Sequence, residues 1–207
     1  MTLIEENPSV SRDYNLINNA LNAVLFNGRC ENKHIYLDFE GEMRFDLAEK
    51  LSQRPAQVDS SICEAVVLQM DLGTKNPFST LTRLDQNWKL SGFDGFPPTT
   101  LFLCSLSLVA ERMRTGRRFS INNYYQRFMD TFQISKDSDE KAIRSQFKCT
   151  ETMWRNFNAW LTRNDGIFGL PTAKSLIPTR RYISYSISQA LIRQGDREHI
   201  RKFLKSV

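Results

Sequence analysis

Apolar and polar residues along the first part of the chain follow more than one spacing. Within residues 11–26 the apolar side chains recur three and four positions apart and Gly28 follows, which predicts an amphipathic helix with a glycine stop. Residues 34–42 alternate instead, as is typical of a half-buried strand. Residues 62–72 form an apolar run with Val66 and Val67 that fits a strand or a buried helix, and we expect a strand.

The pattern changes after residue 98. The segment before it, residues 91–98 (SGFDGFPP), holds two glycines and two prolines and predicts a loop at a boundary. Residues 99–113 are apolar on nearly every side, as expected of a central buried helix. Further helices are expected in several places: after Ser120, after Asp137 or Ser138, from Thr150 to Gly166, and over residues 184–194 and 196–203.

These elements predict an α+β fold, in which a small strand-containing part precedes a predominantly α-helical bundle. We expect an acidic subdomain over residues 1–95 and a basic subdomain over residues 96–207, with one continuous domain as the alternative. Residues 1–100 hold 9 Lys and Arg against 14 Asp and Glu, whereas residues 101–207 hold 19 against 9. A basic half joined to an acidic half favours contact with a polyanion or self-association of unlike faces.

Composition and cysteine usage narrow the class of protein. The 41% hydrophobic and 25% charged residues are ordinary for a folded globular chain. The first residues are acidic and polar, and the longest apolar run is too short to span a bilayer, so we expect a soluble cytoplasmic protein with no membrane partner. Four widely spaced cysteines are expected to be buried thiols, and two distant histidines give no zinc site, so we expect neither metal nor cofactor.

A carboxylate-rich segment is the one candidate for catalysis. Asp38, Glu40 and Glu42 alternate on the polar side of the first predicted strand, and Glu64 lies in the second. Clustered carboxylates bind Mg²⁺ and support phosphodiester hydrolysis, so a metal-dependent nuclease using Asp38, Glu40 and Glu64 is an alternative function. The spaced lysine of such nucleases is missing after Glu64, and a solvated strand face explains the same pattern. We assign no catalytic residue.

Arginines of the second half form the candidate binding surface. Arginine outnumbers lysine there, and its planar fork suits bidentate contact with phosphate. Residues 136–163 also resemble a helix-turn-helix in outline, with Arg155, Asn156 and Asn158 available to a groove, so a DNA-binding regulator is a second alternative. The residues expected to contact nucleic acid are Arg112, Arg114, Arg117, Arg118, Arg155, Arg180 and Arg181.

The spacing of hydrophobic and aromatic residues defines three segments: GFPPTTLFLCSLSLVAERM, NYYQRFMDTF and the run from Trp154 to Leu191. They resemble the amino-terminal region of larger bacterial proteins of anti-phage defence islands, over about residues 95–204. The resemblance implies a non-catalytic module of a multi-protein system and carries over no catalytic residue. We therefore expect a non-enzymatic assembly module whose basic half contacts DNA, RNA or an acidic protein partner.

Overall fold

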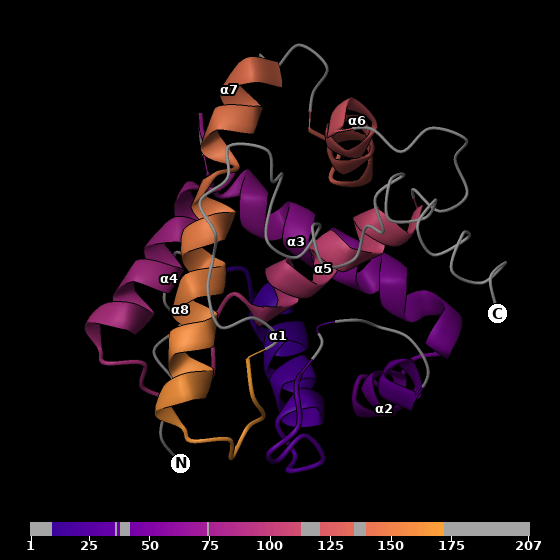
Figure 1. Ribbon diagram of the computed structural model, residues 1–207. Coiled ribbons are helices and arrows are strands. Elements are labelled where there is room, and N and C mark those ends of the chain that lie inside the picture. Colours follow the sequence, from indigo (N-terminus) through magenta and orange to yellow (C-terminus); the bar gives the residue numbers. More distant parts are fainter. Residues whose placement is uncertain are drawn as a thin grey trace, which may run out of the picture.

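The computed structural model describes residues 10–35, 37, 42–73, 75–112, 121–134 and 140–171, and these residues are mainly helical (Figure 1). In chain order the elements are α1 (Arg12–Leu25), α2 (Glu42–Lys50), the short 3₁₀ helix η1 (Pro55–Gln57), α3 (Val58–Asp71), α4 (Ser79–Leu90), α5 (Thr100–Arg112), α6 (Ile121–Thr131), α7 (Glu140–Gln146) and α8 (Cys149–Arg163).

The predicted α+β fold is wrong, because the described residues contain no strand. The apolar run expected to be the second strand is helix α3. Its buried residues, among them Ile62, Val66 and Met70, recur four positions apart and face α1 and α5. The apolar residues of this run occupy more than one side of the helix and show no clear period, so the pattern did not distinguish the two structures.

The first predicted strand is also absent from the described residues. His34 forms one isolated parallel bridge with Leu170, and the Ile35 N–H donates to the Leu170 carbonyl at 3.0 Å. Ile35 is buried as the alternation predicted, but helix α2 already begins at Glu42. Residues 36 and 38–41 lie outside the described residues.

Helix α5 lies in the centre of the described part and contacts α1, α3, α6 and α8 (Figure 1). Every side chain from Leu101 to Val109 is buried. The hydroxyls of Ser105 and Ser107 donate to carbonyls one turn earlier, so these polar groups are satisfied inside the core. The prediction of a central buried helix is confirmed.

The other predicted helices fall into three groups. The helix expected over residues 11–26 is α1 (Arg12–Leu25), and α6 and α7 begin close to their expected starts. Helix α8 begins one residue before Thr150, whose hydroxyl donates to the Phe147 carbonyl at 2.9 Å instead of capping the helix. The helices expected over residues 184–194 and 196–203 lie outside the described residues. Helices α2 and α4 were not predicted. Helix α2 buries only Leu47 and Ala48, whereas α4 buries Leu81, Leu84 and Trp88 at the helical spacing of three and seven residues.

Asparagines of α1 hold the loop that leads into α5. The side-chain amides of Asn18 and Asn22 both donate to the Pro97 carbonyl, at 3.2 and 3.1 Å. The Asn18 oxygen in turn accepts the Leu101 N–H at 2.8 Å, which is one of the donors that a helix start leaves without an internal partner. The Tyr14 hydroxyl donates to the Pro98 carbonyl at 3.1 Å. These bonds fix the loop of residues 91–98 against α1.

The predicted boundary between residues 95 and 96 falls within this loop, which joins α4 to α5. One buried cluster includes side chains from both sides of it, such as Leu21 and Ile62 before and Phe102 and Trp160 after. The division into an acidic and a basic subdomain stays a prediction.

Replacing Asn18 tests how much the loop depends on α1. We expect Asn18→Ala to lower the free energy of unfolding by about 1–3 kcal/mol, because it leaves the buried Leu101 N–H without its acceptor. Urea unfolding followed by circular dichroism measures the loss. The neighbouring Asn19→Ala is the matched control, since Asn19 is exposed and bonds only to Asn15 one turn earlier. Equal stability of the two variants would contradict the role given to Asn18.

Candidate binding cleft and cationic face

The loop after α4 forms one wall of an open cleft. Gly92 and Gly95 have φ angles of 76° and 70°, in the left-handed region that glycine adopts without strain. The turn returns the chain to α4, where the Phe93 N–H donates to the Trp88 carbonyl and the two rings pack edge to face at 4.8 Å. Phe96 then stacks on Phe26 of the segment after α1, with ring centroids 5.5 Å apart.

The end of α8 and the turn after it form the opposite wall. The helix stops before Gly166, as predicted, and that glycine has a φ of 83°. A Cβ at Gly166 would also lie 2.5 Å from the Asn32 side chain, so the turn needs a glycine for space as well. The turn brings Phe168 onto Trp160, where the two rings lie parallel within 3° at 4.9 Å.

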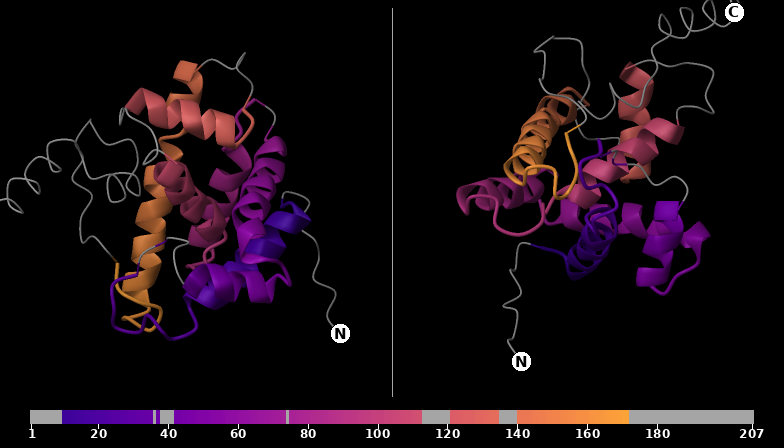
Figure 2. Two further views of the ribbon diagram at one scale, coloured as in Figure 1. Left: turned by 90° about the vertical axis from the view of Figure 1, so that its right-hand side faces the viewer. Right: turned by 60° about the horizontal axis from the view of Figure 1, so that its bottom comes forward.

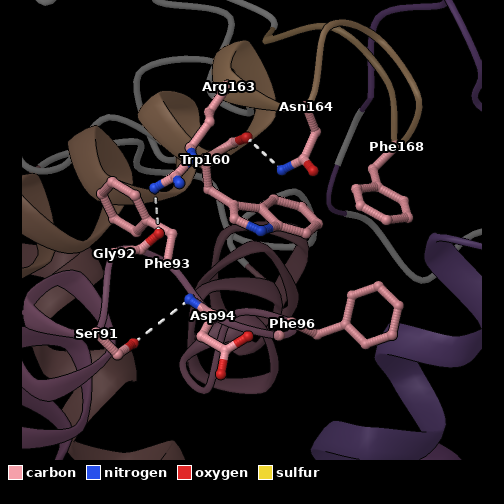
Figure 3. A pocket seen from close by; sticks show the side chains of 10 residues that line it. Ser91, Gly92, Phe93, Asp94, Phe96, Trp160, Arg163, Asn164 and Phe168 are labelled. Atoms are coloured by element: carbon pink, nitrogen blue, oxygen red, sulfur yellow. Dashed lines mark hydrogen bonds between the residues drawn. The ribbon is translucent and has the colours of Figure 1, made fainter.

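The cleft between these walls has a volume of about 500 Å³ and combines aromatic and charged groups (Figure 3). The guanidinium of Arg163 crosses it to donate to the Gly92 carbonyl, which ties the two walls together. Asp94 and Phe96 belong to the wall of residues 91–96, where Phe96 packs edge to face with Trp160 of the other wall and remains 44% exposed. The arrangement offers a ring surface, a carboxylate and a guanidinium at one opening.

Beneath the cleft, α4 and α8 lie side by side in Figure 1 and in the right-hand view of Figure 2. Asp85 accepts a 2.6 Å bond from the Asn156 amide, and one turn further along both helices Trp88 meets Trp160 at 6.1 Å. Because the contacts advance in the same direction along both helices, α4 and α8 run parallel and end together at the cleft.

The exposed side of α8 carries a row of cations. Lys148, Arg155 and Arg163 are all exposed, and their spacing of seven and eight residues keeps them on one side of the helix. At 1.5 Å per residue they lie about 10 and 12 Å apart along the axis. We call these three residues the cationic stripe. Lys89 of α4 is also exposed and stands three residues before Gly92, whose carbonyl Arg163 binds.

The structure describes few of the arginines that the sequence singled out. Arg155 is exposed as expected and belongs to the cationic stripe. Arg112 ends α5. Arg114, Arg117, Arg118, Arg180 and Arg181 lie outside the described residues, so their role in binding stays a prediction.

One of the two asparagines expected to contact a DNA groove, Asn156, is not available to it. Asn156 is 4% exposed and donates its amide to Asp85, so it is part of the core between α4 and α8. Asn158 is half-buried. Adjacent residues on a helix point about 100° apart, which is why Arg155 faces solvent while Asn156 does not.

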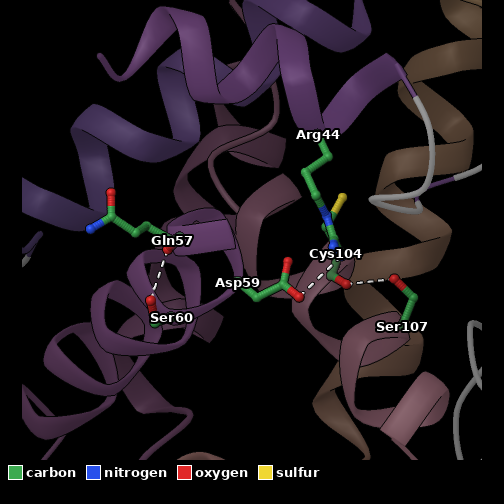
Figure 4. A network of polar contacts seen from close by, with 6 residues as sticks. All are labelled: Arg44, Gln57, Asp59, Ser60, Cys104 and Ser107. Carbon is green, nitrogen blue, oxygen red and sulfur yellow. Dashed lines mark hydrogen bonds and ion pairs between the residues drawn. The ribbon is translucent and has the colours of Figure 1, made fainter. Parts of the chain in front are cut away.

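Of the candidate nuclease carboxylates Asp38, Glu40 and Glu64, only Glu64 lies among the described residues. Asp38 and Glu40 lie outside them, and Glu64 is exposed on helix α3 rather than on a second strand. The described residues show no group of three metal-ligating side chains. Nearby, Asp59 pairs with Arg44 of α2 at 3.0 Å, an ion pair that joins α2 to the first turn of α3 (Figure 4).

All four cysteines are free thiols, of which Cys63 and Cys104 are buried and Cys30 and Cys149 are half-buried. Burial raises the pKa of Cys149 to about 11, so this group stays a neutral thiol at physiological pH. Among the described residues no helix combines the length and the apolar character needed to cross a membrane.

No family model, curated protein or solved structure matches this chain. The cleft itself was not predicted from the sequence, which indicated only that residues 91–98 form a loop. The signal available was the pair of phenylalanines that this glycine- and proline-rich segment carries, since large apolar residues in a loop must pack against something or remain exposed.

The buried carboxyl of Asp85 makes stability depend on pH. Burial raises its pKa from 3.8 to about 6, although the bond from Asn156 opposes the rise. Since the folded-state pKa exceeds the ordinary one, Asp85 contributes stability that is complete below about pH 4 and is lost as the pH rises through about 6. At neutral pH the ionised carboxylate lowers the stability of the folded protein most, because its buried Oδ1 has no hydrogen-bond partner.

We therefore expect Asp85→Asn to be more stable than the wild type by about 1–3 kcal/mol at pH 7.5 and by much less at pH 4. An asparagine there still accepts the Asn156 amide but carries no charge. Urea unfolding across this pH range measures the difference, with the exposed Asp94→Asn as the control. The same stability gap at both pH values would contradict the assignment.

Proposed function

We propose that this chain is a non-enzymatic interaction module that binds nucleic acid along the exposed side of α8. The observation that carries the proposal is the cationic stripe of Lys148, Arg155 and Arg163, which ends at an open aromatic cleft. Guanidinium groups bind phosphate oxygens bidentately, and a row of cations on one rigid helix follows a polyanionic backbone without reorganisation.

The net charge of the chain supports this partner. The formal charge is +5, and the second half of the sequence carries the excess of arginine. Along α8 the stripe faces solvent, whereas Glu151, the one acidic residue of that helix, is half-buried in the first turn. An electrostatic footprint of this kind attracts polyanions and does not by itself select a sequence.

The position of the perturbed groups favours binding over catalysis. The pKa values of Tyr14, Tyr124 and Asp85 are raised mainly by burial, and each of these residues belongs to the packed interior. Catalytic sites usually expose such groups to a substrate in a cleft.

A place for the module within a bacterial multi-protein system rests on the resemblance over about residues 95–204 and stays part of the proposal.

Arg155 provides the first test, because it lies in the middle of the stripe. We expect Arg155→Glu to weaken the binding of short labelled single strands and to lower the slope of log affinity against log salt by about one. Fluorescence anisotropy across a salt series measures both quantities.

The matched control is Arg83→Glu. Arg83 is exposed on α4 but stands two residues before Asp85, so it points away from α8. Binding that falls equally in both variants would show a general charge effect and no defined face. Absence of binding by the wild type at low salt would overturn the proposal and point to an acidic protein partner.

A further inference from the structure

We propose that the cleft between the loop of residues 91–96 and the end of α8 receives an unpaired nucleobase, which makes single-stranded nucleic acid the ligand class. This inference rests on the proposed function and specifies it. It follows from three features of the cleft: the held but partly exposed ring of Phe96, the presence of both a guanidinium and a carboxylate, and continuity with the cationic stripe.

Phe96 is the ring on which a base would stack. It is held by Phe26, stacked at 5.5 Å, and by the edges of Trp160 and Phe168 at 6.1 and 5.5 Å. These contacts fix its orientation, yet 44% of the residue remains exposed. An ordered, partly exposed aromatic ring stacks a base with little loss of side-chain freedom, and every base has a face that it can stack.

The polar groups of the cleft select against a simple ion. Arg163 would repel a cationic ligand, and Asp94 would repel an anionic one (Figure 3). The edge of a nucleobase carries hydrogen-bond donors and acceptors on a neutral ring, so it suits both groups. A carboxylate accepts in particular from the exocyclic amino group of cytosine, which thymine lacks.

The cleft also lies where a strand bound to the stripe would pass. Arg163 is both the last cation of the stripe and the residue that crosses the cleft to Gly92. A backbone following Lys148 and Arg155 along α8 therefore reaches the opening at Arg163. Phosphates on the stripe and a base turned into the cleft can be bound by the same strand.

The test compares two single strands of equal length and charge, one of normal nucleotides and one abasic. We expect the wild type to bind the normal strand at least about fivefold more tightly, and Phe96→Ala to remove most of that difference. Phe45→Ala is the matched control, because Phe45 is 63% exposed and lies on α2. Circular dichroism melting establishes that each variant is folded.

Equal affinity for the two strands in the wild type would overturn the cleft inference and leave the proposed function intact, whereas failure to bind either strand would overturn the proposed function. If Phe96→Ala still bound the normal strand more tightly than the abasic strand, the base would bind elsewhere. Asp94→Asn keeps the test decisive if Phe96→Ala is unstable. We expect it to reduce a wild-type preference for oligo-dC over oligo-dT, and an unchanged ratio would contradict the inference.

Discussion

The hydrogen bonds from Asn18 and Asn22 of α1 to the Pro97 carbonyl hold the loop of residues 91–98, and with it the start of α5, against α1. Asn18 also accepts the Leu101 N–H, so one side chain satisfies a loop acceptor and a helix donor inside the core. Without Asn18, the buried Leu101 N–H would lose its acceptor, whereas the Pro97 carbonyl would keep the bonds from Asn22 and the Thr100 hydroxyl. Phe96 directly precedes Pro97, and its place in the cleft therefore depends on α1.

A second constraint sets the other wall of the cleft. Asp85 and Asn156 form a buried polar pair in a largely apolar interface between α4 and α8. A shift of either helix by one turn would leave a buried carboxyl without its donor, so the pair fixes the register of the two helices at a cost in stability when Asp85 ionises. That register lets Arg163 reach Gly92 across the cleft.

The sequence predicted the helices whose apolar residues repeat clearly or cover the whole surface, as in α1, α5 and α8. It failed for α3, because the apolar residues of that run occupy more than one side and show no clear period that separates helix from strand. It also missed α4, although the buried Leu81, Leu84 and Trp88 follow the helical spacing of three and seven residues, so the pattern was available there. Only the burial of Thr80 and Asp85 in α4 depends on neighbours distant in the chain.

The sequence by itself determined the charge asymmetry, which is a sum over the residues of each half, and also the loop at residues 91–98 and the buried character of α5, since these two are properties of residues close together in the chain. The tertiary structure alone decided the cleft, because Phe26, Phe96, Trp160 and Phe168 come from separate segments that meet only through packing. It likewise decided that Arg155 faces solvent, since the outward face of a helix is defined only once its inward face has a partner.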